Sequence, residues 1–552
     1  MAEPKENLQM EKIVSLCKRR GFVFQSSEIY GGINGFWDYG PLGAELKRNV
    51  KELWWNAMTR QRDDVAGLEA TIIMSPKIWE ASGHVATFSD PMIDCKTCKG
   101  RFRADQTDEI ACPQKPSKCV NECHGEKTEA RAFNLMFQTY VGPTATAADI
   151  AYLRPETAQA IFAQFKNVLE TSRQKIPFGI AQVGKAFRNE VTPRNFIFRS
   201  REFEQMELEF FIKPDEVIEA ISGSVATLAE VFGVTPSGGA EPAKAGTPNP
   251  AANWGWEVWH RYWVEERVRF YEGIGLSRET LGFHHQTPKE LAHYARACTD
   301  ILFKFPFSKK EADGNVTGDE LEGIAARSDF DLSQHQRFSG KPMGVFDDEL
   351  RAAWAKLPKE KSDNLYQRYY AHRKNYLLKS GVEEALAATQ AADEANGLAK
   401  GQYIPHVIEP SAGVDRLILA LVANAYSEET KTDDKGKSET IYTMKFHPRV
   451  APIKVGVLPL LKNKPELVSK AMAVRDLLRP WMNVYYDEGG SIGKRYARQD
   501  EAGTPFCVTI DFDTLGEKPE LLDTVTLRYR DDGRQERLKI SELRDWLLAR
   551  IR

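Results

Sequence analysis

The sequence predicts a mixed α and β protein that carries a separate α/β domain at its C-terminal end. In the segment 177–213, two apolar-alternating runs flank a polar turn, which is the pattern of an antiparallel hairpin. Apolar residues at helical spacing precede and follow that segment. Near residue 445 the composition shifts to apolar runs alternating with helical patterns, which indicates a second domain.

The length and composition bound the classes of protein that fit. A chain of 552 residues predicts three or four folding units at roughly 150 residues each. Hydrophobic residues at 42% and charged residues at 28% exclude global disorder. The net charge of −3 lacks the basic excess typical of DNA-binding proteins, so no DNA partner is expected and an RNA partner must meet a local patch.

No membrane partner is expected, because no apolar run approaches the roughly 20 residues that a bilayer span needs. The N-terminal segment MAEPKENLQMEK lacks the apolar core of a signal peptide. A cytoplasmic location is therefore expected.

The N-terminal part alternates helices with a Gly-rich loop. Helical spacing predicts a helix over 10–20 that Gly21 ends, and the glycines at 31–43 predict a loop. An amphipathic helix then follows from Gly43, and a strand at 71–74 ends before Pro76. Further along, the Pro-, Gly- and Ala-rich run at 237–253 predicts a flexible insertion, and 357–400 predicts solvated helices.

The hairpin has two chemically different faces. Side chains alternate across a strand, so Met206, Leu208 and Phe210 share one face. The opposite face is acidic with one aromatic ring: Phe203, Gln205, Glu207 and Glu209. A solvated outer face would explain the carboxylates. Arginines and carboxylates on the same hairpin, such as Arg188 and Glu190, suit a triphosphate, a base and an ammonium group instead.

A third segment, IEPSAGVDRLILALV at 408–422, predicts a strand, a break at Gly413 and a helix from Val414. Arg416 in the first turn of that helix favours an anionic ligand. The alternative is an ordinary strand-to-helix corner. A phosphate-binding loop is rejected at 488–496, because neither the required first glycine nor a Ser or Thr after the lysine is present.

Three segments together resemble the three signature motifs of class II aminoacyl-tRNA synthetases: the helix from Gly43 with its strand and Pro76, the FRNE…REFEQMELEFF hairpin, and EPSAGVDR. In detail they are similar to the dimeric glycyl-tRNA synthetases of the bacterial-type branch. The resemblance implies an α+β fold. An antiparallel-sheet class II catalytic domain with insertions at about 213–283 and 340–400 would span 1–440, and a C-terminal α/β anticodon-binding domain would span 445–552.

The resemblance also implies an ATP site. It assigns Arg188 to the α-phosphate, places the adenine between Phe203 and Arg416, and lets Glu190 hold the adenine amino group or organise Arg188. These three polar residues, Arg188, Glu190 and Arg416, are the expected catalytic residues. Glu320 and Leu321 would line the site through Mg²⁺ or backbone contacts. The expected ATP-binding set is Arg188, Asn189, Glu190, Phe198, Arg201, Phe203, Glu320, Leu321, Gly413 and Arg416.

By the same resemblance, glycine would meet Arg103, Glu156, Phe203, Gln205, Glu207, Glu409, Ser411 and Gly413. Most class II enzymes have glycines at alternate positions of the third motif, where this chain has Glu409 and Ser411. Side chains there would overpack a larger substrate at a cost of roughly 1–3 kcal/mol. The carboxylates can hold the substrate ammonium by charge-assisted hydrogen bonds. Glycine has no smaller competitor, so no editing domain is expected.

The implied function is a glycine–tRNA ligase that forms glycyl-adenylate from glycine and ATP with Mg²⁺ and then charges tRNA(Gly). A homodimer is expected, because the first motif usually forms the two-fold interface in this class. Two alternatives are a catalytically silent synthetase-like protein, disfavoured by the presence of Arg188 and Arg416, and a synthetase for alanine or serine.

Five of the eight cysteines lie in a knuckle at about 91–130. Cytosolic cysteines rarely form disulfides, so structural zinc is the leading functional interpretation. The candidate ligands are Cys95, Cys98, Cys119 and Cys123. Three residues separate the last two, which breaks the CxxC pattern, so a metal-free knuckle is the alternative.

The C-terminal domain resembles the anticodon-binding domain of the glycyl, histidyl, threonyl and prolyl enzymes. Basic residues that could meet RNA are Lys494, Arg495 and Arg498 on one helix and Arg528, Arg530 and Arg534 on a later strand and turn. A solvated basic surface is the alternative.

Overall fold

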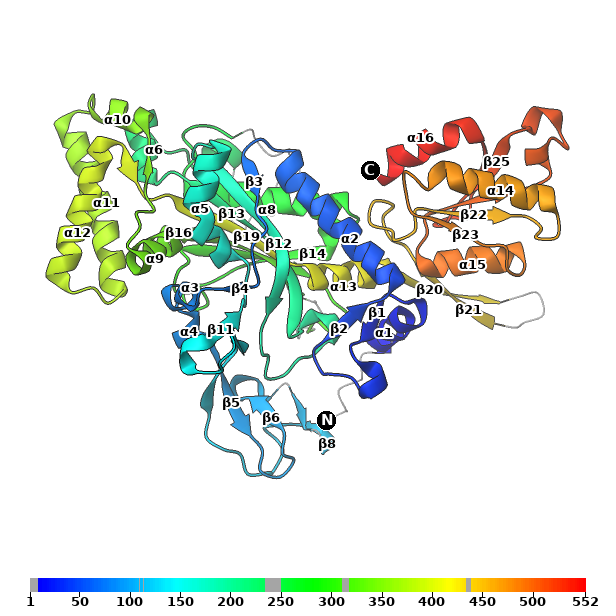
Figure 1. The fold of residues 1–552 in the computed structure, drawn as a ribbon, viewed down its shortest axis with the longest axis horizontal. Helices are drawn as coiled ribbons and strands as arrows, with labels where there is room; N and C mark the ends of the chain where they lie inside the picture. The colour runs from blue at the N-terminus through cyan, green and yellow to red at the C-terminus, as the bar shows by residue number, and fades with distance from the viewer. Residues whose placement is uncertain (1–7, 109, 113, 234–249, 310–316, 433–437) are drawn as a thin grey trace.

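The computed structural model describes residues 8–108, 110–112, 114–233, 250–309, 317–432 and 438–552. Its larger part is built on a seven-stranded sheet in the order β14, β15, β16, β19, β13, β12, β3 (Figure 1). The strands are β3 (Val65–Gly67), β12 (Phe178–Phe187), β13 (Glu202–Ile212), β14 (Leu281–His285), β15 (Ala297–Phe303), β16 (Asp319–Ser328) and β19 (His406–Gly413). Every neighbouring pair is antiparallel except β3 and β12.

The predicted hairpin is confirmed. Strands β12 and β13 pair in register from Phe178 opposite Phe211 to Phe187 opposite Glu202. The predicted faces are also confirmed, because Met206 and Leu208 lie in the apolar core. The opposite face is not a solvated one, since Glu207 is only 2% exposed.

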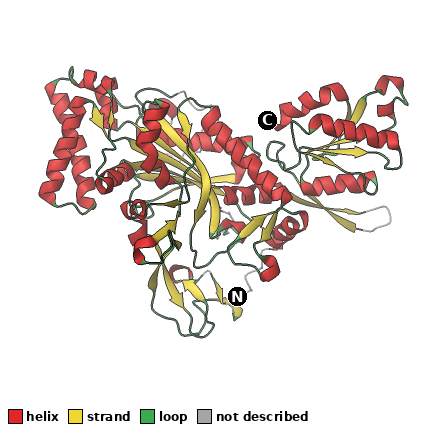
Figure 2. Cartoon of the chain, in the orientation of Figure 1, coloured by secondary structure: helices red, strands yellow, loops and turns green. Residues whose placement is uncertain are grey.

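Helices cover both faces of the sheet (Figure 2). One face packs on α2 (Pro41–Trp55), α8 (Trp256–Gly273) and α13 (Val414–Ala425), whose apolar residues join the largest core cluster. The other face packs on α5 (Ala158–Ser172) and α9 (Phe330–Ser339). The helix predicted from Val414 is confirmed, and α8, inside the stretch expected to be an insertion, supplies much of the core.

The N-terminal region follows the prediction except at one strand. Helix α1 (Leu8–Arg20) confirms the expected helix. After α2, the strand that joins the central sheet is β3, and the segment expected at 71–74 forms only the short β4 (Ile73–Met74), which pairs with β11 (Ile150–Leu153). Gly67 lets β3 approach α2, because a Cβ at this position would lie 2.5 Å from the Trp55 ring.

Two further units extend from this body. Helices α11 (Lys359–Lys379) and α12 (Glu384–Gly397) form a pair beside α6 (Asp215–Ser222) and α10 (Asp348–Trp354), at the left of Figure 1. The cysteine region lies below the sheet in that view. Its strands are β5 (Ser89–Asp94), β6 (Arg101–Arg103), β7 (Ala111–Cys112), β8 (Lys115–Cys119) and β9 (Arg131–Asn134). Most of the run at 237–253 lies outside the described residues.

The C-terminal α/β unit has its own core and a five-stranded sheet in the order β23, β22, β24, β25, β26. Its elements are β22 (Val455–Pro459), α14 (Pro465–Leu478), β23 (Val484–Tyr486), α15 (Ile492–Ala502), β24 (Phe506–Ile510), β25 (Thr524–Tyr529), β26 (Gln535–Lys539) and α16 (Ile540–Ile551). The hairpin of β20 (Tyr426–Thr432) and β21 (Ser438–Met444) precedes it. Among the helices that the structure describes, none combines the length and apolarity that a bilayer crossing requires.

Candidate active site

Three carboxylates gather on the α5 side of the central sheet, and we call Glu156, Glu207 and Glu409 the acidic cluster. Glu207 lies on β13 and Glu409 on the neighbouring β19, while Glu156 lies just before α5. The Glu207 and Glu409 residues are 2% and 6% exposed. Ser411 is directly opposite Glu207 in the strand register. The structure therefore brings together four of the residues expected to bind glycine.

Glu207 accepts four hydrogen bonds, two on each oxygen. Its Oε1 accepts from the Ser411 hydroxyl and from Gln205 Nε2, each at 2.8 Å. Its Oε2 accepts from the backbone and hydroxyl of Thr157 at the start of α5. Gln205 keeps its Oε1 buried and without a hydrogen-bond partner. A substrate ammonium could donate a hydrogen bond to that amide oxygen.

Glu409 is held by Arg327, which was not among the residues predicted from the sequence. Nη1 of Arg327, on β16, lies 2.8 Å from both Glu409 oxygens. The Nε and Nη2 atoms of the same guanidinium donate to Asp331 on α9 at 2.7 and 2.9 Å. An arginine in the apolar alternation of a central strand is the one sequence signal that could have found it.

Glu156 pairs with a histidine from a different part of the chain. His84 Nε2 lies 3.3 Å from Glu156 Oε2, and Gln159 Nε2 donates to Glu156 Oε1 at 3.1 Å. Burial disfavours the charged carboxylate, but His84 and Arg327 outweigh it and lower the pKa of Glu156. Glu156 is therefore ionised at neutral pH.

Burial, together with the proximity of the carboxylates, raises the pKa of the other two. Burial raises the pKa of Glu409 to about 7, with Glu207 and Glu156 adding to the effect against the opposing charge of Arg327. Burial and Glu156 raise the pKa of Glu207. Like-charged groups in a desolvated site favour a cation among them, so the acidic cluster suits an ammonium group.

Arg188 adjoins the acidic cluster and faces two aromatic rings. Its Nε donates to the Pro155 carbonyl at 3.0 Å, next to Glu156, and its charge offsets part of the rise in the pKa of Glu207 that burial and Glu156 cause. The guanidinium carbon lies 5.3 Å from the centre of the Phe203 ring and 5.5 Å from that of Phe88. The Arg188 cation thus lies beside the acidic cluster, directly after the end of β12, where the hairpin turn begins.

Arg416 lies at the start of α13, as predicted, but its aromatic contact is Phe198. The guanidinium carbon is 4.6 Å from the Phe198 ring centre, and Nη1 is 3.2 Å from Glu320 Oε2. Glu320 has a side chain 50% exposed, whereas the adjacent Leu321 is 1% exposed. The exposed Glu320 carboxylate offers oxygen ligands of the type that Mg²⁺ prefers.

Other predicted nucleotide residues shape the hairpin turn. Arg201 donates to the Glu190 carbonyl from Nε at 3.1 Å and Nη2 at 2.9 Å, and from Nη1 to Asn34. The backbone of Asn189 donates to Leu135. Gly413 pairs with Gln205 at the end of β19. Glu190, Arg201 and Asn189 therefore order the loop through their contacts with the protein.

Arg103 lies in a neighbouring charged group. Its Nη1 is 2.9 Å from Asp90, and its Nε and Nη2 atoms bond both oxygens of Asp105. Burial raises the pKa of Asp90, and the hydrogen bonds to Asp105 raise that of Arg103; Glu190 adds to both shifts, which places it in the same group. The structure thus brings Arg103 to the Glu190 side of the site, and its ion pairs are with aspartates of its own region.

The four cysteines expected to bind zinc do not converge as a set. Cys95 and Cys98 are neighbours, with the Cys98 amide 3.5 Å from the Cys95 sulfur. Within the parts of the chain that the structure describes, no three cysteine sulfurs come within 4.8 Å of one another. The geometry gives zinc no closed tetrahedral site at Cys95, Cys98, Cys119 and Cys123.

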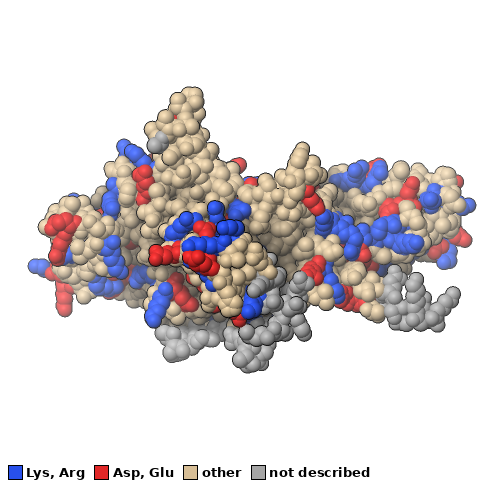
Figure 3. Space-filling model, turned by 90° about the horizontal axis from the view of Figure 1, so that it is seen from below, with Lys and Arg blue, Asp and Glu red and all other residues tan. Residues whose placement is uncertain are grey.

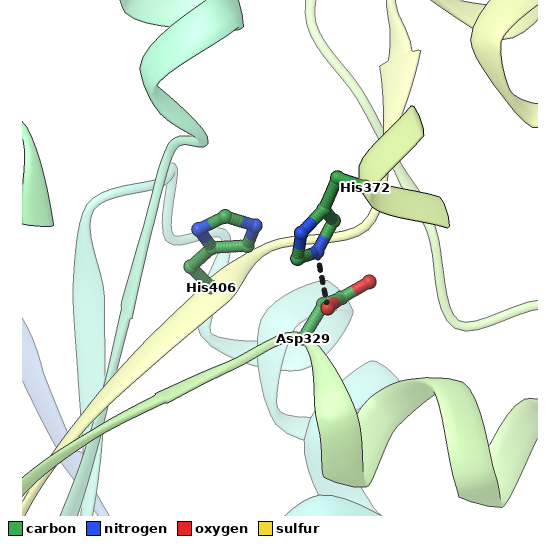
Figure 4. A group of neighbouring side chains, drawn as sticks. All are labelled: Asp329, His372 and His406. Atoms are coloured by element: carbon green, nitrogen blue, oxygen red, sulfur yellow. Dashed lines mark hydrogen bonds and ion pairs between the residues drawn. The ribbon is translucent and has the colours of Figure 1, made fainter. Parts of the chain in front are cut away.

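Among the residues that the structure describes, one group brings three metal-ligating atoms within 4.8 Å of one another: the buried Asp329 and His406 and the half-buried His372 (Figure 4). His372 Nε2 is 3.0 Å from Asp329 Oδ1, and Arg373 and Ser333 bond Oδ2. Burial and the nearby Arg296 lower the pKa of both histidines. With arginines already facing the imidazoles, this group suits a hydrogen-bonded link between α11 and the sheet better than a cation.

Comparison with known proteins identifies the family of this chain. The family model described as "tRNA synthetase class II core domain (G, H, P, S and T)" matches residues 145–237, and the one described as "Anticodon binding domain" matches 454–550. Glycine–tRNA ligase of Treponema denticola is 44% identical over 97% of this chain and 96% of its own length. Those of Thermus thermophilus and Streptomyces coelicolor are 41% and 40% identical over 98% of this chain, covering 99% and 98% of their own lengths. On this near full-length similarity, the chain belongs to the glycine–tRNA ligase family of class II aminoacyl-tRNA synthetases.

Proposed function

We propose that the chain is a glycine–tRNA ligase, which joins glycine to ATP as glycyl-adenylate and then passes the glycyl group to the 3′ end of tRNA(Gly). The assignment of glycine as the amino acid substrate rests on the acidic cluster. The side chains of Glu409 and Ser411, on the strand beside Glu207, occupy the space that a substrate side chain would need. The substrate that suits this site therefore has an ammonium group and no side chain.

The ammonium of glycine would lie among Glu156, Glu207 and Glu409. Ser411 and Gln205 orient Glu207 through their hydrogen bonds, and the free Gln205 Oε1 offers one more acceptor. Arg327 positions Glu409 from the opposite side. Oriented acceptors reduce the ordering that glycine binding requires.

ATP would lie on the Arg188 side of the cluster. Arg188 would contact the α-phosphate, and Phe203 would face the adenine. Arg416, supported by Phe198, would lie at the other side of the nucleotide. Glu320 is the residue that would hold Mg²⁺, which supplies charge neutralisation to the phosphates. Arg103 would approach the glycine carboxylate from the Glu190 side.

The reaction needs no nucleophilic side chain from the protein. A carboxylate oxygen of glycine attacks the α-phosphorus; the new oxygen–phosphorus bond forms as the bond to the departing pyrophosphate breaks. Arg188 stabilises the negative charge that develops on the α-phosphate oxygens. The site accelerates the step by holding the two substrates in line.

The rest of the molecule would serve tRNA and assembly. Residues 1–440 would form the catalytic domain, and residues 445–552 would bind the anticodon. A homodimer is part of the proposal. Ile29 and Tyr30, in the turn before α2, are 88% and 87% exposed, and a subunit contact near this first motif would cover such apolar surface.

Glycine-dependent exchange of pyrophosphate into ATP tests the proposal most directly. The purified protein is expected to support exchange with glycine and to support it far less with alanine or serine. Aminoacylation of tRNA(Gly) should follow. Well-folded protein that shows no glycine-dependent exchange would favour a silent RNA-binding relative, and faster exchange with alanine or serine would change the substrate.

A further inference from the structure

Glu209 is a buried carboxyl group to which no residue of the site donates a hydrogen bond. It lies on β13, two residues from Glu207 and on the same face, and it is 0% exposed. Both of its carboxyl oxygens are buried without a hydrogen-bond partner. A buried carboxylate normally accepts several hydrogen bonds, because unpaired charge is costly to desolvate. Glu207, which accepts four hydrogen bonds, shows how this chain stabilises an ionised carboxylate.

The strand register places Glu209 against Glu409. Strands β13 and β19 pair Glu207 with Ser411 and Phe210 with Ile408, so position 209 lies opposite position 409. Directly opposite residues of an antiparallel pair have Cβ atoms about 4.5–5.5 Å apart, and like charges there destabilise the sheet. On its other side Glu209 faces Ile180 of β12, which has no charge.

Arg327 donates hydrogen bonds to Glu409 but not to Glu209, so the two facing carboxyl groups differ in their partners. Its Nη1 contacts both oxygens of Glu409, and its remaining donors, Nε and Nη2, go to Asp331. None of these hydrogen bonds reaches Glu209. Two facing buried carboxyls cannot both ionise cheaply, so the proton belongs on the one without donors.

We propose that Glu209 is held as an uncharged carboxylic acid, which allows Glu409 to keep its negative charge for the glycine ammonium. The inference rests on the proposed role of Glu409 in glycine binding. The charged and titratable groups around Glu209 are Glu207 on its own strand, Glu409 on β19, Arg327 on β16 and Asp331 on α9.

The electrostatics of these neighbours agree with the geometry. Burial and then Glu409 raise the pKa of Glu209 well above its usual value, and Arg327 offsets only part of this. The neutral acid also removes a negative charge from beside Glu409. Ionisation of both would favour protonation of Glu409, which would weaken its attraction for an ammonium group.

The matched variants Glu209→Gln and Glu207→Gln test the proposal. They make the same isosteric, charge-neutral change on one face of one strand. In glycine-dependent pyrophosphate exchange, E209Q should keep the KM for glycine and its pH profile within about twofold, because the residue is already neutral. E207Q should raise that KM about tenfold or more, because it removes an ionised acceptor.

A raised KM in E209Q comparable to that of E207Q would overturn the proposal. So would a lowered thermal midpoint or loss of folding in E209Q, since a neutral isostere should fit at least as well. Infrared spectroscopy adds a readout independent of activity. The carbonyl band of a protonated carboxyl should be present in the wild type at pH 8 and absent in E209Q. If the wild type showed no exchange with glycine, the proposed function would fail, while this band would still decide the charge of Glu209.

Discussion

The Ser411 hydroxyl orients Glu207 and occupies the strand position where a larger substrate would need room. Replacing Ser411 with Gly removes the hydroxyl and its 2.8 Å hydrogen bond to Glu207. We predict that S411G weakens glycine activation and improves the ratio of alanine to glycine kcat/KM by about tenfold, the scale of one methylene in a fitted site. Pyrophosphate exchange with each amino acid measures the ratio. Ser411→Thr, which adds a methyl group, should lower glycine activation without helping alanine. An unchanged ratio in S411G would count against exclusion by side-chain bulk.

Glu409 gives glycine binding a pH dependence near neutrality. Its pKa of about 7 means that the carboxylate predominates above pH 7 and the neutral acid below it. Only the charged form attracts the ammonium, so kcat/KM for glycine should fall as the pH decreases through about 7. Exchange rates at subsaturating glycine between pH 6 and 8.5 measure this, and Glu409→Gln should remove the dependence along with most of the activity. A level wild-type profile would contradict the assignment.

Some residues of the site could be predicted from the sequence, and others could not. Strand alternation predicted Glu207 on the acidic face of the hairpin, whereas Ser411 and the role of Arg188 were expected from the resemblance to the class II motifs. Arg327 and His84 could not be predicted. Each contacts a carboxylate distant in sequence, 82 residues away for Arg327 and Glu409. Such contacts exist only after the strands have been ordered into a sheet.

At the scale of elements, predictions from apolar periodicity were right where an element buries one face. The hairpin, α1 and α13 follow the alternation or helical spacing of their own residues. The strand after α2 was placed wrongly because β3 is only three residues long and its pairing is decided by a parallel contact with β12. A strand that short carries too little pattern to be found alone.

The pair of helices α11 and α12 is attached to the catalytic sheet by a buried arginine. Arg373 is 1% exposed; it pairs with Asp329, at the end of β16, and with Glu394 on α12. Arg373→Met should lower the free energy of unfolding by about 3–5 kcal/mol, because it leaves Asp329 buried and uncompensated. The exposed Arg368→Met, on the same helix, should cost less than about 1 kcal/mol. Urea unfolding compares the two, and equal losses would contradict a specific attachment.

Arg373 also links this attachment to the glycine site. Asp329 is two residues from Arg327, so movement of the α11 contact should disturb the guanidinium that holds Glu409. R373M is therefore expected to raise the KM for glycine as well as destabilise the protein, whereas R368M should leave the KM unchanged.

At the scale of the whole molecule, the C-terminal unit is docked on the catalytic body by side-chain and backbone contacts. Phe446 packs against Phe22 with ring centres 5.7 Å apart, and Asn49 on α2 donates to the carbonyls of Val450 and Ala451. Arg530 donates to Gly503 and Phe446. Two of the six basic residues that the sequence offered for RNA contact, Arg495 and Arg530, are thus buried and hold the fold.

Exposure separates the basic residues that can reach RNA from those that stabilise the domain. Figure 3 shows Lys and Arg gathered on the C-terminal unit, at the right of the view. Lys494 and Arg534 are exposed, and among the described residues Arg534 pairs only with the exposed Asp532, whereas Arg498 and Arg528 form ion pairs with the largely buried Asp487 and Asp500. A prediction from spacing alone could not distinguish them, because it shows which residues share a helix face and not which carbonyls or carboxylates that face meets.

Lys494→Glu should therefore separate the two half-reactions. Exchange with glycine takes place in the catalytic domain and should be unchanged, while kcat/KM for tRNA should fall about tenfold and depend less steeply on salt, as expected when one phosphate contact is lost. Arg495→Met is the contrasting variant. It removes the guanidinium that donates to Pro459 and Leu460, so it should act by destabilising the domain and lower the thermal midpoint, which K494E should leave in place. If K494E charges tRNA as well as the wild type does, RNA contacts this unit through some other surface than the start of α15.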